Sequence, residues 1–250
     1  MKKLLFTSSV IVLLGIFISI SGCKKDDTEK LSPIIFNPTV IYGSMTDQDG
    51  NTYKTVTIGT QTWMAENLRT TKFNDGTEIP LISDSNAWDS IAWHNTKSPA
   101  YCYYLNDAAT YRNIYGALYN GYAVISGKLA PIGWHVATDA DWTTLTEYLG
   151  GEGVAGGKLK ETGTTHWGSP NFGATNESGF TSLPGGYRGN STPDDQDAGY
   201  HDMGNLGSFW TATEHMSGLL IFCEMFKYGK TVIRPLDSKY HGFSVRCVKD

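Results

Sequence analysis

Apolar and polar residues alternate in short runs near the start of the folded region. The run over 52–58 follows the turn at Asp49-Gly50 and places apolar side chains on alternate positions, which predicts a strand. A Gly-Thr turn then leads into 61–64, a second predicted strand. Another Asp-Gly turn precedes 77–80. We therefore expect the domain to open with small antiparallel strands.

A helical period is clearest over 138–149. Thr138 can cap this segment, and Asp141 stands at the third helical position, from which an acidic side chain reaches back to the cap. Apolar residues then recur on one face, and Gly150-Gly151 supplies a left-handed stop. Residues 115–124 fit a shorter helix or a strand almost equally well.

The second half of the chain contains few periodic segments. Residues 152–208 are dominated by Gly, Asn, Ser, Thr and Asp, which predicts long loops wrapped on the core. Aromatic residues within these loops favour order, because disordered segments are poor in aromatics. Four short strands follow, over 209–213, 219–226, 230–234 and 243–248. The expected fold class is α+β, with a small, mostly antiparallel sheet, one or two helices and much ordered loop.

An apolar leader precedes this domain. Lys2 and Lys3 are followed by an apolar run over 4–20, and small residues at 21–22 lead directly to Cys23. This is the arrangement of a bacterial lipoprotein signal, in which the Cys23 thiol carries the diacylglycerol. The alternatives are an ordinary cleaved signal or a single membrane span, although the run is shorter than the roughly 20 residues that a span needs. We expect a signal peptide over 1–22 and lipidation at Cys23.

Residues 23–42 are predicted to form a flexible tether. The stretch 24–30 is fully polar, and the segment that follows contains two prolines and no helical period. The lysines and aspartates at 24–27 resemble the signal that sends lipoproteins of the Bacteroidetes group to the cell surface, although charged tethers are common. The expectation is an outer-membrane lipoprotein, anchored in the membrane through Cys23 and exposed at the cell surface. Its folded domain should occupy 43–250.

Composition and charge narrow the classes of partner. The chain has 28 Gly, 7 Trp and 14 Tyr, and only 18% of its residues are charged. Its formal net charge is −5, and loss of Lys2 and Lys3 with the leader makes the mature chain more acidic still. Phosphate binding needs clustered Lys and Arg, so we expect no nucleic-acid partner. Oligomeric state is not readable from the sequence.

Three cysteines besides Cys23 would lie in an oxidising compartment. Cys102, Cys223 and Cys247 allow one disulfide and one free thiol, and their spacing does not select the pair. A zinc site is disfavoured, because the sequence has no C-x-x-C motif and no histidine pair at ligand spacing near these cysteines.

Seven motifs in a fixed order resemble one known family. They are QTWMAENL at 61–68, YGALYN at 115–120, GWHVATDADW at 133–142, GATNESGF at 173–180, LPGG at 183–186, FWTATE at 209–214 and GFSVRCV at 242–248. Together they resemble the Fibrobacter succinogenes major paralogous domain (FISUMP), from about residue 43 to the last residue. That family occurs in surface and secreted lipoproteins of Bacteroidetes and Fibrobacteres, and its biochemical function is unsettled. The resemblance therefore implies location and fold more than activity.

A more distant resemblance concerns the fold alone. The segments 133–142 and 242–247 are similar to parts of formylglycine-generating, sulfatase-modifying domains, which implies a C-type-lectin-like fold. The catalytic cysteine pair of those enzymes has no counterpart upstream of Cys247. Members of the FISUMP family often have a cysteine where this chain has Ala130, so a family disulfide pairing cannot be transferred.

Two sets of residues are candidates for ligand binding. Trp88, Trp93, Trp167 and Tyr187 lie on Gly- and Asn-rich segments and could form a platform for sugar rings or peptide side chains, or could instead anchor loops to the core. Asp194, Asp195 and Asp197 share one loop, where they could bind calcium or remain solvated. Calcium is the one cofactor that the sequence suggests.

Catalytic constellations are weaker. Glu66, Glu177 and Glu214 could supply a carboxylate pair for glycoside hydrolysis, or could hydrogen-bond loop backbone. His135 lies in a predicted strand and is expected to be a hydrogen-bonded structural residue. The favoured hypothesis is a non-catalytic binding or adhesion module for glycan or protein. The alternatives are an extracytoplasmic polysaccharide hydrolase, or accessory protein of polymer degradation, and a structural envelope component.

Overall fold

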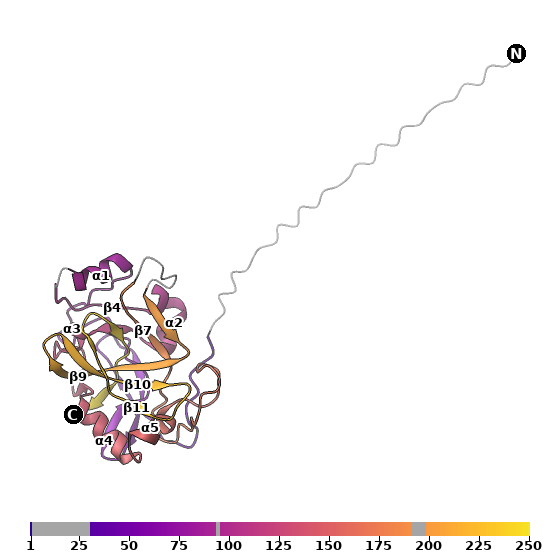
Figure 1. Cartoon of the computed structure of the whole chain (residues 1–250), viewed down its shortest axis with the longest axis vertical. Coiled ribbons are helices and arrows are strands. Elements are labelled where there is room, and N and C mark those ends of the chain that lie inside the picture. The colour runs from indigo at the N-terminus through magenta and orange to yellow at the C-terminus, as the bar shows by residue number, and fades with distance from the viewer. Residues whose placement is uncertain (2–30, 94–95, 192–198) are drawn as a thin grey trace.

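Two mostly antiparallel sheets form the framework of this computed structural model (Figure 1). The structure describes Met1 and residues 31–93, 96–191 and 199–250. Within these ranges there are five α-helices, which are α1 (Ser85–Trp93), α2 (Ala108–Tyr115), α3 (Gly121–Val124), α4 (Asp139–Tyr148) and α5 (Glu152–Leu159). A 3-10 turn, η1, spans Tyr104–Asn106. The fold class is therefore α+β, as predicted, with more helices than the one or two expected.

The five-stranded sheet has the order β1-β2-β3-β14-β6. The second sheet has nine strands and follows the path β11-β10-β9-β7-β13-β5-β4, with β12 on β10 and β8 on β7. The strands of the two sheets, in chain order, are β1 (Gly43–Thr46), β2 (Thr52–Ile58), β3 (Gln61–Met64), β4 (Tyr101–Cys102), β5 (Leu118–Asn120), β6 (Trp134–Val136), β7 (Gly185–Arg188), β8 (Tyr200–Met203), β9 (Leu206–Met216), β10 (Leu219–Phe226), β11 (Val232–Ile233), β12 (Leu236–Ser238), β13 (Gly242–Phe243) and β14 (Cys247–Lys249).

Locally encoded elements match the sequence predictions. The opening hairpin pairs β2 with β3, and its register aligns Val56 with Trp63. Helix α4 begins after a complete capping box, in which Thr138 accepts from the Asp141 amide and Asp141 accepts from the Thr138 amide. The segment 115–124 contains both predicted alternatives, since β5 runs directly into α3.

The segment 152–208 is less irregular than predicted, because it contains α5, β7 and β8. Gly156 and Gly157 gave α5 the composition of a loop, but in the structure they permit close packing. A Cβ on Gly156 would lie 2.7 Å from the Thr231 carbonyl oxygen, and one on Gly157 would lie 2.3 Å from the Gly173 carbonyl oxygen. The glycines are therefore required by neighbouring backbone rather than by flexibility.

The strand predicted over 243–248 is divided between the two sheets. Its first part is β13, between β7 and β5, and its last part is β14, between β3 and β6. Residues 244–246 carry the chain from one sheet to the other, which places Arg246 at the crossing.

The hydrophobic core comprises three clusters. In the second, Trp63 of β3 meets Trp142 of α4 with ring centroids 5.1 Å apart, and Phe180 contacts both rings. Because these rings come from a strand, a helix and a loop, the core joins the hairpin, α4 and the long loop.

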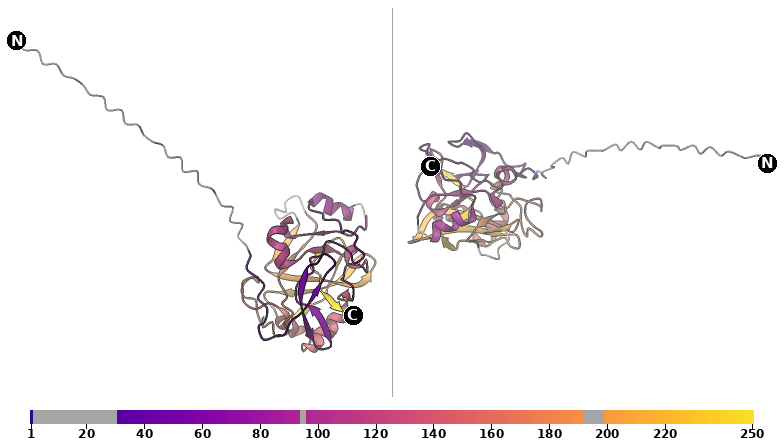
Figure 2. Two further views of the ribbon diagram at one scale, coloured as in Figure 1. Left: turned by 180° about the vertical axis from the view of Figure 1, so that it is seen from behind. Right: turned by 90° about the horizontal axis from the view of Figure 1, so that it is seen from above.

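Residues 31–42, which the sequence assigns to the tether, pack against the domain in the structure. We call this segment the arm. The Ile35 amide donates to Glu161 Oε1 at 2.6 Å, and the Asn37 side chain donates to the Asn176 carbonyl at 2.9 Å. Phe36, Val40 and Tyr42 of the arm pack against the second core cluster. The arm reaches the domain on the side opposite the C-terminus in all three views (Figures 1 and 2).

The predicted disulfide is not formed. Cys102, Cys223 and Cys247 are free and buried, and each belongs to a different core cluster. Over the described ranges, no helix combines the length and apolar character needed to cross a membrane. Cys23 and the leader lie outside the described residues.

Candidate functional site

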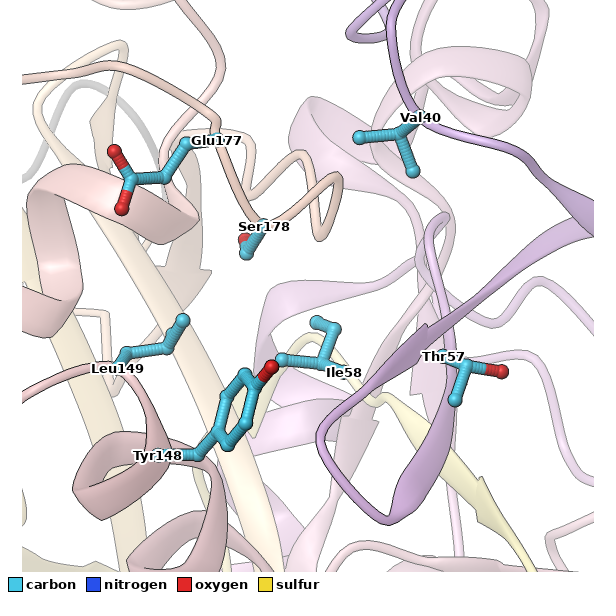
Figure 3. A pocket seen from close by; sticks show the side chains of 7 residues that line it. All are labelled: Val40, Thr57, Ile58, Tyr148, Leu149, Glu177 and Ser178. Carbon is cyan, nitrogen blue, oxygen red and sulfur yellow. The ribbon is translucent and has the colours of Figure 1, made fainter.

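A groove of about 350 Å³ opens where four chain segments meet (Figure 3). These segments are the arm, the β2–β3 hairpin, the end of α4 and the loop after α5. The side chains that line the groove are Val40, Thr57, Ile58, Tyr148, Leu149, Glu177 and Ser178. Since its lining is divided among distant parts of the sequence, the groove exists only in the folded chain with the arm in place.

Tyr148 is the prominent side chain of this groove. It is the last residue of α4, and 66% of its surface is exposed. Gly59, at φ 62°, lies in the β2–β3 turn, and a Cβ there would be 2.9 Å from Tyr148 Cδ2. The turn therefore supports the ring, while most of the ring remains open to solvent. An aromatic surface that is both exposed and held in position is suited to stacking.

Polar groups stand both at the edges of the groove and near its middle, where Figure 3 places the Tyr148 hydroxyl beside Ile58. The Thr57 hydroxyl lies 3.2 Å from that of Thr62, and Glu177 pairs with Lys158 at 3.0 Å. In Figure 3 the polar ends of Thr57 and Glu177 point away from the centre, where Tyr148 and Ile58 face each other. The groove thus presents polar and apolar surface in similar measure, with the Tyr148 ring and its hydroxyl beside Ile58.

The loop that carries Glu177 and Ser178 is fixed from within. Ser178 Oγ donates to the Lys158 carbonyl at 2.7 Å, which ties the loop to α5. Arg246, which is fully buried, donates to the carbonyls of Phe180 and Thr181 at 2.9 and 3.0 Å. These bonds position one wall of the groove without using the solvent-facing side of the loop.

Two further concavities differ in character. One, of about 420 Å³, contains Arg234, whose guanidinium is already paired with Asp139 at 3.0 Å and also with Glu152. The other, of about 160 Å³, is lined by Trp134 and small apolar side chains. In the first cavity the Arg234 charge is already paired with carboxylates of the protein. The second cavity is smaller than the ~300 Å³ at which ligand pockets usually begin.

His135, at the edge of the smallest cavity, is hydrogen-bonded as predicted. Its Nδ1 lies 2.7 Å from Asp250 Oδ1 and its Nε2 lies 3.1 Å from Asp141 Oδ2. Burial alone would lower the pKa of His135, but the hydrogen bonds and charges of the two carboxylates outweigh it and raise that pKa. Through these two contacts His135 links β6 to α4 and to the last residue of the chain.

The predicted aromatic platform is not assembled. Trp88 of α1 is 1% exposed and Trp167 is fully buried, since both side chains pack into core clusters. Tyr187 is half-buried against Phe243, with ring centroids 5.7 Å apart. The side chain of Trp93 lies outside the described residues. Glycines from other parts of the chain pack closely on the two buried rings, since a Cβ on Gly242 would lie 3.1 Å from Trp88 Cζ2 and one on Gly207 would lie 3.3 Å from Trp167 Cη2.

The calcium candidates are outside the part of the chain that the structure describes, namely Asp194, Asp195 and Asp197. Among the described residues, no group of three His, Cys, Asp or Glu side chains is arranged to hold a metal ion.

The three candidate carboxylates occupy separate environments. Glu66 accepts from the Lys54 amide at 2.5 Å and pairs with Arg69, whereas Glu177 pairs with Lys158 and Glu214 with Lys239 at 2.5 Å. None of the three cavities described above contains two of them. The structure therefore does not bring Glu66, Glu177 and Glu214 together.

Sequence reasoning missed Tyr148 and the buried polar residues of the long loop. A tyrosine on the outer face of the predicted helix was the available signal for the groove. Glu161 and His166 form a buried pair, with 2.7 Å between Oε2 and Nδ1, and His166 Nε2 lies 3.0 Å from the Ser32 carbonyl oxygen. Their position in a polar, glycine-rich segment concealed their burial beneath the arm.

Comparison with known proteins identifies the family of this chain. No curated protein and no solved structure matches the chain. The family model of the Fibrobacter succinogenes major domain matches residues 56–249, which include six of the seven groove residues but not Val40 of the arm. The chain therefore belongs to the Fibrobacter succinogenes major domain family.

Proposed function

We propose that this protein is a surface-anchored binding module that holds a saccharide in the Tyr148 groove. The observation that carries the proposal is the exposed ring of Tyr148, which is supported by Gly59 and has Ile58 beside it and Val40 across the groove. A sugar ring has an apolar face that stacks on an aromatic ring, and its hydroxyls require polar partners at the rim.

The arrangement of the groove supports a binding role because its walls are tied to the rest of the domain. Tyr148 stands on a capped helix, and the opposite wall is tied to Arg246 and α5. Ordering costs on binding are correspondingly small, which favours affinity from a modest contact area. The fold itself is proposed to be C-type-lectin-like, on the basis of its paired sheets and long ordered loops.

Anchoring forms the other half of the proposed function. The apolar leader followed by Cys23 supports lipidation at that thiol, and the charged residues at 24–27 support export to the outer surface of the outer membrane. A lipid anchor would hold the binding domain at the cell envelope, where polysaccharides are presented.

A glycan array probed with the purified full-length protein tests the binding proposal. We expect binding to at least one class of neutral saccharide, with competition by the free sugar. Parallel arrays with calcium and with a chelator test whether Asp194, Asp195 and Asp197 contribute a cation site. If the array shows no binding while a pull-down from envelope extracts recovers a protein partner, the saccharide proposal is wrong.

Surface protease treatment of intact cells tests the anchoring proposal. We expect the native protein to be degraded, whereas Cys23→Ala should be released from the membrane fraction. A protein that is protected in intact cells would contradict the outward orientation.

A further inference from the structure

Two aromatic side chains are exposed on adjacent loops. Phe172 is 57% exposed and Tyr228 is 71% exposed. The Phe172 amide donates to the Lys227 carbonyl at 2.7 Å, so the two loops run side by side at this point. Exposed apolar side chains that lie together favour a contact surface, whereas single scattered ones do not.

A buried lysine fixes both loops. Lys160 is fully buried, and its Nζ donates to the carbonyls of Phe172, Phe226 and Gly229 at 3.1, 2.9 and 2.8 Å. One ammonium group thus uses its three hydrogens to join the loop of Phe172 to the turn of Tyr228. The exposed rings are therefore held at the surface by interior structure.

Two lysines lie on the loop that carries Tyr228. Lys227 Nζ lies 4.9 Å from the centroid of the Tyr228 ring, and Lys230 Cβ would lie 3.2 Å from a Cβ on Gly173, the residue after Phe172. Within the described ranges, neither Lys227 nor Lys230 forms an ion pair with a carboxylate, although the chain as a whole is acidic. We call Phe172, Lys227, Tyr228 and Lys230 the anchor-side platform.

The platform lies where the arm first meets the domain. His166 Nε2 lies 3.0 Å from the Ser32 carbonyl oxygen, and two residues later a Cβ on Gly168 would be 3.3 Å from Lys227 Nζ. This end of the described chain is on the side of the domain opposite the C-terminus (Figures 1 and 2).

Chain length limits how far the platform can be from the bilayer. Ser32 is nine positions after Cys23, and even a fully extended chain of that length spans only about 30 Å. If lipid is attached at Cys23, as proposed above, the side of the domain that bears Ser32 must stay near the membrane surface. Aromatic rings with adjacent lysines are the side chains that favour the headgroup region of anionic bilayers.

We infer that the anchor-side platform binds the anionic headgroup layer of the membrane that holds the lipid anchor. This inference rests on the proposed lipidation of Cys23. Contact at Phe172 and Tyr228 would orient the domain on the bilayer, with its opposite side directed away from the membrane.

The test uses lipidated full-length protein reconstituted in vesicles. An environment-sensitive fluorophore is attached at Phe172→Cys, and a matched control carries it at Ile132→Cys, a site that is 85% exposed beside the C-terminus. The native cysteines at 102, 223 and 247 are buried and should not label. In vesicles containing phosphatidylglycerol we expect a blue shift at position 172 and none at position 132.

Charge and lipid composition provide the second measurement. Lys227→Gln with Lys230→Gln should lower the ratio of docked to undocked domain about thirtyfold, since each lysine contributes about a fivefold preference for an anionic surface. Vesicles of phosphatidylcholine alone should weaken docking in the same direction.

The outcomes separate the two proposals. A lipid-modified Cys23 peptide in mass spectrometry, together with a position-172 label that stays in water, overturns the platform and leaves the anchor intact. An unmodified Cys23 overturns both. If a uronate polymer shifts the emission of the position-172 label to the blue and vesicles do not, the ligand of the platform is an acidic glycan. That result also overturns the inference.

Discussion

Arg246 joins three separate parts of the chain through one guanidinium group. It stands where the chain crosses from β13 to β14, and donates to the Asn67 side chain and the Met64 carbonyl at 2.8 Å each. Its remaining bonds go to the Phe180 and Thr181 carbonyls, and its guanidinium carbon lies 4.5 Å from the Phe180 ring centroid. The arginine of the GFSVRCV motif is therefore a structural residue.

We predict that Arg246→Lys lowers the free energy of unfolding by about 3 kcal/mol or more, because a lysine cannot supply the planar set of donors and leaves buried carbonyls unsatisfied. Urea unfolding at neutral pH measures the loss. Arg234→Lys is the matched control, since Arg234 is partly exposed and its ion pairs should contribute about 1 kcal/mol or less. Equal losses in the two variants would contradict the structural role of Arg246.

At the scale of elements, the arm is held over a buried pair of polar side chains. His166 and Glu161 have side chains that are at most 1% exposed, and the arm contributes the Ser32 carbonyl and the Ile35 amide to them. Burial alone would lower the pKa of His166, but the hydrogen bond and charge of Glu161, with the Ser32 carbonyl, raise it above 6.5. Tyr115 packs edge-on against the His166 ring.

This raised pKa predicts the direction of a pH effect. Because the folded protein binds the His166 proton more tightly than the unfolded chain does, the stabilisation is complete below pH 6.5 and is lost as the pH rises through the folded pKa. Relative to His166→Gln, the native chain should therefore be most stabilised at acid pH. Urea unfolding at a series of pH values, with His215→Gln as a histidine-matched control, measures this difference. A difference that grows with pH would contradict the assignment.

Elements encoded by local chemistry were predictable from the sequence, whereas those that depend on distant neighbours were not. The capping box of α4 and the β2–β3 hairpin require only adjacent residues. Helix α5 and the arm depend on contacts with residues more than 50 positions away, such as Gly156 with Thr231 and Ile35 with Glu161. The candidate site could not be predicted for the same reason. Whether Trp88 is buried and Tyr148 exposed depends on how distant parts of the chain pack together.

At the scale of the whole molecule, three core clusters hold the domain together without a crosslink. Each cluster contains one of the free thiols. Burial raises the pKa of the Cys102 thiol to about 12, and burial likewise raises the pKa values of Cys223 and Cys247. A buried, protonated thiol reacts slowly, so these cysteines should remain reduced even in an oxidising compartment.

We predict that a strong reductant leaves the melting temperature of the native protein unchanged. A disulfide typically contributes about 2–4 kcal/mol, which in a domain of this size corresponds to a shift of roughly 5 °C or more. Thermal unfolding followed by circular dichroism, with and without reductant, distinguishes the two cases. A fall of that size in the melting temperature on reduction would show that the predicted disulfide forms.

The affinity of the full-length protein for the tightest-binding saccharide of the glycan array tests the central claim most directly. Titration calorimetry should show that Tyr148→Ala weakens binding about thirtyfold or more, as expected for an aromatic residue at the centre of a site. Tyr228→Ala is the matched control, because it removes a tyrosine of similar exposure outside the groove, and it should leave the affinity for the saccharide unchanged. Undiminished binding by Tyr148→Ala would contradict the proposal that this groove is the saccharide site.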